Sequence, residues 1–374
     1  MNSCFVIGPV KSGTTLLISL LDSHPELALF PMEVKIFTHW IERFADDKTR
    51  YSHLNDFFLK SSKIKLMDES RTGTADIMNS GRIDFSGFDF KAFEQLQKEK
   101  SVMSENYNLT GPKLIQKYIL DLHRSLSQVL DVPNPKVFVS KEGNHGANYI
   151  KEIIELFPPA RFIVLVRDPR DIFVSFKVIA EKKRQGVHSP TFKDNVSVCR
   201  FVNGNKGKNI SSYTELYLDR AHEKNFIFVK YENLVRNPVE EMTKIAQYLE
   251  IDNIASLQYP SNFGNRWGGN SSSMGEFNGV ESNRLNKWTR ELATSEIRII
   301  EFFLDEYLTQ AKYVIERTKI KRLRILADVI GTEAQSIKTS FRVSARGVYY
   351  FAKHLVVTMK AVYSCLFDVK YLGK

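Results

Sequence analysis

The sequence has few cysteines, no long apolar run and no cluster of metal-ligating residue types. Its cysteines are Cys4, Cys199 and Cys365, which are too few and too widely spaced for a disulfide scaffold or a zinc site. No stretch is apolar enough, for long enough, to cross a membrane, and the first residues lack the basic and apolar regions of a signal peptide. No His, Cys, Asp or Glu cluster has the spacing of a metal site. These absences predict a cytoplasmic globular protein without a bound metal.

Excess charge is scarce over most of the chain and is concentrated near its end. The net charge of the 374 residues is +10. Residues 316–374 contain 12 lysines and arginines against 4 aspartates and glutamates, so residues 1–315 together carry only +2. A nearly neutral body does not indicate a nucleic-acid partner. We expect residues 316–374 to form a basic helical C-terminal extension.

Short apolar segments alternate with helical patterns along the chain. We predict strands at 5–7, 136–139, 162–166 and 226–229, and helices at 14–23, 147–157, 170–182, 238–248 and 291–311. Such alternation is typical of an α/β fold with a parallel sheet. Residues 38–135 are less regular, with helices expected at 42–60 and 112–130. We predict one domain over 1–315, in which 38–135 is an acceptor-binding insertion.

A glycine-containing loop lies between the first predicted strand and helix. It runs from Gly8 to Gly13, and the helix opens with Thr14 and Thr15. The glycines let backbone N–H groups turn inward, and the helix N-terminus adds positive potential, so the loop predicts an anion site. Lys11 adds a mobile charge. A Walker A motif has its lysine where this chain has Thr14, so the loop is not of that type. The alternative is a glycine turn with a surface lysine.

A second candidate anion site follows the apolar strand that ends at Val166. Arg167 stands directly after that strand, and Ser175 lies eight residues later in the next helix. Ligands of open α/β sheets bind beyond the carboxyl ends of the strands, and arginine suits bidentate phosphate binding. The alternative is a salt bridge that shapes the turn, a role that we expect for Asp168 and Asp171.

Two separate phosphate sites suggest a ligand with two separated phosphates. One such ligand is 3′-phosphoadenosine-5′-phosphosulfate (PAPS), which has a 3′-phosphate and a 5′-phosphosulfate. The chain resembles the PAPS-dependent sulfotransferase superfamily, above all the branch of tyrosylprotein and bacterial carbohydrate sulfotransferases. The resemblance rests on segments that follow one another in the family's order, namely 11–17, 21–25, 167–175, 229–238 and 286–292. It implies a P-loop-type, three-layer fold with a central parallel sheet flanked by helices.

The resemblance also implies roles for particular residues. The 5′-phosphosulfate would be held by Lys11, Ser12, Gly13, Thr14 and Thr15. Sulfuryl transfer proceeds by in-line displacement and resembles phosphoryl transfer in relying on positioning and electrostatics. Lys11 would stabilise the oxygen that bridges sulfur and phosphorus.

A glutamate base is a further implication of the resemblance. Glu33 follows the second short strand and is the candidate, although its alignment with the family needs a one-residue shift. The alternative is a solvated loop carboxylate. His39 and His145 are competing bases, but each is more typical of a structural or surface histidine.

Other residues of the resembling segments have two interpretations. Arg167 and Ser175 would bind the 3′-phosphate. Lys141 can contact the sulfate or acceptor, or be a plain surface lysine. Tyr231 can pack on adenine or belong to the core. Lys287 can reach a phosphate, beside a Trp288 that is more typical of core.

The acceptor side of the reaction is not named by any motif. We expect residues 38–135 and 178–225 to shape a pocket for a hydroxyl or amine of a sugar, lipid or peptide. Residues 265–273 are polar and loop-rich and can close over the nucleotide. Residues 341–367 have the pattern of an amphipathic helix, which suits a membrane surface, the domain itself or a second subunit of a homo-oligomer.

Three other functions compete with sulfuryl transfer. A P-loop kinase of a small metabolite requires a Walker lysine after Gly13, and that lysine is absent. A module that binds membrane or nucleic acid through the basic extension would leave both phosphate motifs without a purpose. A sulfotransferase-like chain that binds nucleotide without chemistry is the third alternative.

Overall fold

The structure is a computed structural model that describes residues 2–33, 50–60, 88–105, 109, 111–144, 146–184, 197–267, 279–280, 282, 285–315, 322–340, 356 and 358–363. It divides into two compact units. The first comprises Met1–Val166 and Arg220–Ser282, and the second comprises Arg167–Asp219 and Asn283–Lys374. The predicted boundaries, 1–315 and 316–374, stay predictions.

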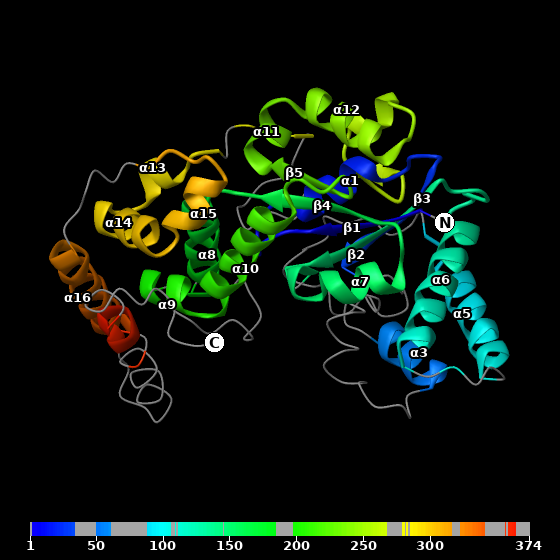
Figure 1. Ribbon diagram of the computed structural model, residues 1–374, viewed down its shortest axis with the longest axis horizontal. Helices are drawn as coiled ribbons and strands as arrows, with labels where there is room; N and C mark the ends of the chain where they lie inside the picture. Colours follow the sequence, from blue (N-terminus) through cyan, green and yellow to red (C-terminus); the bar gives the residue numbers. More distant parts are fainter. Residues whose placement is uncertain are drawn as a thin grey trace. The chain divides into compact units, whose positions relative to one another are not determined.

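The first unit is built on a five-stranded sheet of order β2-β3-β1-β4-β5, in which every pair of neighbours is parallel (Figure 1). The strands are β1 (Asn2–Ile7), β2 (Leu27–Glu33), β3 (Val137–Gly143), β4 (Ala160–Val166) and β5 (Phe226–Lys230). The central strand β1 is buried from Ser3 onward, as an apolar strand between two neighbours should be. The sequence-based prediction of a central parallel sheet is therefore confirmed.

Helices cover this sheet. They are α1 (Thr14–Leu21), α3 (Tyr51–Leu59), α5 (Phe90–Ser104), α6 (Gly111–Val129), α7 (Ile150–Leu156), α11 (Tyr231–Arg236) and α12 (Pro238–Leu249), with short 3₁₀ turns η2 (Gly146–Tyr149) and η3 (Ala255–Gln258). In Figure 1, α11 and α12 lie on one side of the sheet and α7 lies on the other. This arrangement agrees with the expected three-layer fold.

The insertion contributes an aromatic cluster to the core. Phe30 of β2 contacts Phe58 of α3 and Phe93 of α5, with ring centroids 5.8 and 5.9 Å apart. The helix expected at 112–130 is confirmed as α6. Of the helix expected at 42–60, the described part forms α3, whereas 42–49 lies outside the described residues.

The second unit is helical over its described residues. Its helices are α8 (Pro169–Arg184), α9 (Val198–Asn203), α10 (Asn205–Arg220), α13 (Trp288–Glu291), α14 (Thr294–Phe303), α15 (Asp305–Gln310) and α16 (Arg322–Ser340). The single helix predicted at 291–311 is wrong, because the chain breaks twice. Ala293 is extended and donates its N–H to the Glu296 carboxylate at 2.9 Å, which starts a new helix, and Leu304 leaves helical geometry at ψ 26°.

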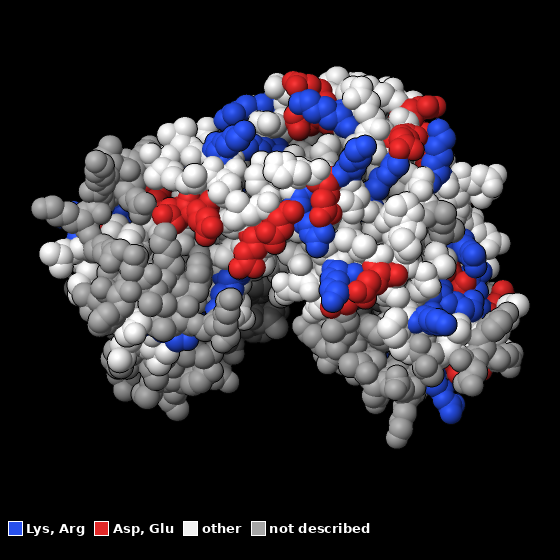
Figure 2. All heavy atoms as spheres, viewed as in Figure 1, with Lys and Arg blue, Asp and Glu red and all other residues white. Residues whose placement is uncertain are grey.

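The surface of the first unit mixes charges of both signs. Over α11 and α12, basic and acidic side chains lie among one another on the face in Figure 2. This mixing agrees with the near-neutral balance of residues 1–315. None of the helices in the described part of the chain is both long enough and apolar enough to cross a membrane.

Candidate active site

The loop between β1 and α1 has the geometry of an anion cradle. Lys11 and Gly13 adopt left-handed backbone conformations with φ of 62° and 97°, and the Ser12 N–H donates to the Pro9 carbonyl at 3.0 Å. The first helical hydrogen bond of α1 runs from the Leu17 N–H to the Gly13 carbonyl, and no side chain in the described part of the chain caps the helix. The N–H groups of the first turn therefore have no partner within the helix and are available to an anion.

Two glycines allow this loop to lie against its neighbours. A Cβ on Gly8 would come within 2.8 Å of the Leu165 carbonyl oxygen of β4. A Cβ on Gly13 would lie 2.2 Å from the ring of Tyr231, the first residue of α11. The Ser12 hydroxyl is buried and makes no hydrogen bond to any residue that the structure describes. A tight loop whose buried hydroxyl can donate a hydrogen bond suits the binding of a phosphate-like group.

Replacing Gly13 with alanine should weaken binding of 3′,5′-adenosine diphosphate (3′,5′-ADP) by about tenfold or more, the cost of a lost charge-assisted hydrogen bond. The new methyl group must displace Tyr231 or the loop. Gly279→Ala is the matched control, because Gly279 has a similar φ of 93° but, among the described residues, no atom within 4 Å of the place that a Cβ would occupy. Calorimetry measures 3′,5′-ADP binding by both variants and separates the effect of the steric clash from that of backbone strain. If both variants lost the same affinity, the loop would not be the anion site.

Glu33 and Lys141 meet at the carboxyl ends of the strands, where the phosphate loop also lies. They are partners in the register of β2 and β3, and the Lys141 Nζ lies 3.8 Å from the Glu33 Oε1. The same ammonium donates to the Thr15 hydroxyl at 2.6 Å. The Lys141 side chain is only 5% exposed, against 19% for Glu33, so the interpretation of Lys141 as a surface lysine is wrong. A buried cation thus joins the predicted base to the predicted phosphate loop.

The segment 21–25 has a structural function that the sequence did not reveal. The buried Asp22 carboxylate accepts hydrogen bonds from the Ser261 hydroxyl at 2.7 Å and the Gly264 N–H at 3.0 Å. These contacts fix the hairpin of β6 (Ser261–Asn262) and β7 (Asn265–Arg266) to the end of α1. Of the segment 265–273, which we expect to close over the nucleotide, residues 268–273 lie outside the described residues.

In the second unit, the arginine motif and the 286–288 segment are held together. The Asp171 carboxylate accepts from the N–H groups of Asn286 and Trp288 at 2.9 and 3.0 Å, and these residues flank Lys287. Burial raises the pKa of Asp171, which the Arg167 guanidinium and the Trp288 N–H oppose. Asp171 thus has a structural role, as expected, but through hydrogen bonds from backbone N–H groups, whereas the expected salt bridge of the turn is formed by Asp168 with Arg170.

Individual candidates in this unit have the following surroundings. The backbone N–H and carbonyl of Arg167 both contact the Tyr307 hydroxyl at 3.2 Å. The Ser175 hydroxyl donates to the Asp171 carbonyl at 3.0 Å, and the Lys287 Nζ lies 3.8 Å from the Glu291 carboxylate. Because the residues on either side of Lys287 bond to Asp171, Lys287 is brought to the helix that carries Ser175.

Arg170 is an important residue that the sequence-based predictions do not include. Its guanidinium donates to Asp168 and to Glu301 at 2.7 and 2.6 Å and to the Val314 carbonyl at 2.9 Å. It also lies 3.7 Å from the centre of the Trp288 ring. Arg170 is almost fully buried, so it anchors the turn that begins with Arg167. The alternation of charges in 167–171 was the signal available in the sequence.

The candidate residues fall into two groups. Glu33, Lys141, Tyr231 and the loop residues 8–15 belong to the first unit, whereas Arg167, Ser175 and Lys287 belong to the second. The competing bases, His39 and His145, lie outside the described residues. Among the residues that are described, no three His, Cys, Asp or Glu side chains are grouped so as to hold a metal ion.

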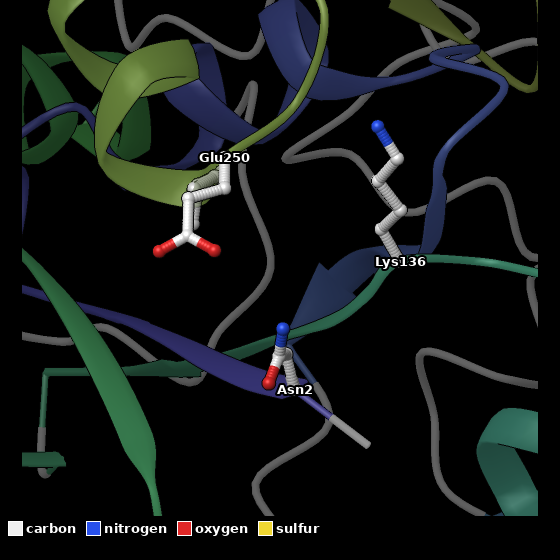
Figure 3. Close-up of a pocket in the computed structure, with 4 residues that line it drawn as sticks. Asn2, Lys136 and Glu250 are labelled. Carbon is white, nitrogen blue, oxygen red and sulfur yellow. The ribbon is translucent and has the colours of Figure 1, made fainter.

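A cavity of about 340 Å³ lies at the opposite end of the strands from the phosphate loop (Figure 3). It is lined by Asn2, Lys136, Leu249 and Glu250. Asn2 begins β1 and Lys136 precedes β3, so the cavity lies at the amino ends of these strands. Ligands of parallel α/β sheets bind at the carboxyl ends, and we therefore assign no part of the reaction to this cavity.

Comparisons with known proteins agree on one family. The model of the family described as "Sulfotransferase family" matches residues 4–255. Omega-hydroxy-beta-dihydromenaquinone-9 sulfotransferase Stf3 of Mycobacterium tuberculosis and Mycobacterium bovis is 29% identical over 147 residues, which are 37% of this chain and 35% of the relative. Protein-tyrosine sulfotransferase of Drosophila melanogaster is 25% identical over 270 residues, which are 67% of this chain and 38% of the relative. The matches thus span little more than a third of these relatives.

A solved structure supports the fold. The sulfotransferase domain from the curacin biosynthetic pathway has a TM-score of 0.50 with this chain at 17% sequence identity. The likeness covers 83% of this chain and 98% of that domain. At this identity the comparison bears on the arrangement of helices and strands alone.

Proposed function

Because this chain belongs to the sulfotransferase family, we propose that it transfers a sulfuryl group from PAPS to a hydroxyl or amine of an acceptor. The proposal rests on one observation: Lys141 contacts both Thr15, which follows the phosphate loop, and Glu33. An uncapped helix end, a buried ammonium and a carboxylate are the groups that such a transfer requires.

Each of these groups has a proposed task. Gly13, Thr14 and Thr15, with the N–H groups of the first turn of α1, hold the 5′-phosphate, as does the hydroxyl of Ser12. Lys11 and Lys141 neutralise negative charge on the group that is transferred and on the oxygen that leaves. Glu33 accepts the proton of the acceptor hydroxyl. PAPS supplies the sulfuryl group, whose bond to the acceptor oxygen forms as its bond to the bridging oxygen breaks.

The second unit supplies the proposed site for the 3′-phosphate. Arg167 and Ser175 bind it, and Lys287 adds a further positive charge. Support comes from the hydrogen bonds that hold the 286–288 segment to Asp171 in the same helix as Ser175. Tyr231 is proposed to lie beside the nucleotide, because its ring covers Gly13 of the phosphate loop.

The acceptor is proposed to carry a hydroxyl group. The two curated relatives are named for a hydroxylated menaquinone and for protein tyrosine, and both of these bear hydroxyl groups. Sugar, lipid and peptide acceptors all agree with this proposal. Cytoplasmic localisation and a homo-oligomer stay predictions. The kinase alternative is disfavoured by Thr14, which begins α1 where the Walker lysine would stand.

Binding of 3′,5′-ADP tests the proposal. Wild-type protein should bind it without magnesium, and Arg167→Ala should bind it about 10- to 150-fold more weakly, which corresponds to roughly 1.5–3 kcal/mol for a charge-assisted contact. Arg124→Ala is the control, because Arg124 is an exposed arginine of α6 whose guanidinium lies 3.4 Å from the Asp121 carboxylate of the same helix. Calorimetry that shows a preference for ATP with magnesium would refute the proposal in favour of a kinase.

A further inference from the structure

Helix α16, which is orange in Figure 1, buries both of its acidic side chains, Asp328 and Glu333. The Asp328 carboxylate accepts two hydrogen bonds from the Arg298 guanidinium, at 2.6 and 2.8 Å. The Glu333 carboxylate accepts the Ser197 hydroxyl and is 1% exposed. Both acids of this helix are therefore used within the protein, and neither contributes a free negative charge to the surface.

The outward face of the same helix is mainly apolar, and Arg324 beside it is 63% exposed. Leu323 is 73% exposed and Ile330 is 53% exposed, and Ala327 and Ala334 are also exposed. The spacings of four, seven and eleven residues place all four on one face of a helix. This is the reverse of the usual helix at a protein surface, and exposed apolar faces of this kind mark sites of interaction.

A second exposed face lies near the end of the chain. Val356, Met359, Lys360 and Tyr363 are all exposed, whereas Ala361 is buried. Spacings of three, four and seven residues again place the exposed side chains on one helical face. Three apolar side chains and one lysine therefore point away from the protein.

The net charge of the C-terminal part of the sequence indicates the kind of partner. Residues 316–374 contain 12 basic and 4 acidic residues, and two of those acids are the inward-facing Asp328 and Glu333. The charge that remains for a partner is therefore strongly positive. A second copy would bring like charges together, which disfavours association. An anionic lipid surface complements both the basic charge and the apolar side chains.

We propose that these two faces bind the surface of a membrane that contains anionic lipids. The first consists of Leu323, Ala327, Ile330 and Ala334, and the second of Val356, Met359, Lys360 and Tyr363. The apolar side chains enter the boundary between headgroups and acyl chains, and the basic side chains remain at the headgroups. The proposal does not depend on the proposed reaction, because it involves neither the phosphate loop nor the arginine motif.

Co-sedimentation of the full chain with lipid vesicles tests this proposal. Vesicles of phosphatidylcholine mixed with phosphatidylglycerol should bind the protein at least about tenfold more tightly than phosphatidylcholine alone, given about fivefold for each basic side chain at the surface. Added salt should weaken that binding. Equal binding to both kinds of vesicle, or binding to neither, would overturn the proposal.

Two variants and a matched control complete the test. Leu323→Gln with Ile330→Gln should lower vesicle binding about tenfold, and Lys360→Glu should lower it only for vesicles with phosphatidylglycerol. The control is Val102→Gln with Met103→Gln, because these residues of α5 are 72% and 65% exposed. Thermal melts check that each variant is folded. A control that loses as much binding as the α16 variant would overturn the proposal, as would a dimer that the α16 variant converts to monomer.

Discussion

Replacing Glu33 with glutamine is expected to lower turnover by about 10²- to 10⁴-fold, the usual contribution of a general base, without weakening 3′,5′-ADP binding. Glutamine has nearly the same shape as glutamate but cannot accept the acceptor's proton. The phosphate loop should keep its geometry, because Lys141 retains its hydrogen bond to the Thr15 hydroxyl. The measurement is transfer of radiolabelled sulfate from PAPS to an alcohol that the wild type sulfates.

The identity of the acceptor gives this experiment its control. An aliphatic alcohol needs a base, whereas p-nitrophenol is a far stronger acid that is already partly ionised at neutral pH and needs a base much less. The loss caused by Glu33→Gln should therefore be large for the alcohol and small for p-nitrophenol. If both acceptors lost activity equally, Glu33 would have a role other than proton transfer. A Cβ on Gly143 would lie 3.1 Å from the Glu33 carboxylate. Gly143→Ala therefore shifts this carboxylate without removing its charge, and its turnover shows how much of the loss is steric.

Replacing Arg170 with methionine should reduce the free energy of unfolding by about 3–5 kcal/mol, the cost of breaking a buried ion pair by removing one partner. Arg170 donates to both Asp168 and Glu301, and these carboxylates are 3% and 1% exposed. Without the guanidinium, two buried carboxylates would lose the cation that they share. Urea titration followed by circular dichroism measures the change.

Two further variants define the origin of that loss. Lys60→Met removes an ion pair with Asp56 that is exposed at both ends, at the end of α3, and should cost less than about 1 kcal/mol. Arg170→Met combined with Asp168→Asn and Glu301→Gln removes all the buried charges together. The triple variant should be more stable than Arg170→Met alone. A triple variant that is equally unstable would show that packing on Trp288, rather than charge, provides the stability.

Local sequence patterns predict the elements around the phosphate loop because those elements are determined by local chemistry. The strand that ends at Ile7, the glycine loop and the helix from Thr14 follow from apolar residues, glycines and helix propensity over about twenty positions. The helix from Pro238 is predicted for the same reason, since proline suits the first turn. Such signals do not depend on distant parts of the chain.

Contacts between distant segments could not be predicted in this way. The sequence leaves Lys141 as either a functional or a surface residue, because its burial depends on β2 and α1. The break at Ala293 depends on a hydrogen bond to Glu296 that competes with helix continuation. The inward acids of α16 are satisfied by Arg298 and Ser197, and no pattern within residues 322–340 indicates these partners.

The position of β1 in the sheet has a consequence for biosynthesis. This strand pairs with β3 and β4, whose residues follow it by more than a hundred positions. At ordinary elongation rates of about 5–20 residues per second, β1 waits roughly 7–30 s for its first neighbour. During that time its apolar residues Cys4–Ile7 are exposed to other chains. Expression at lower temperature or with chaperones should therefore increase the soluble yield of this protein.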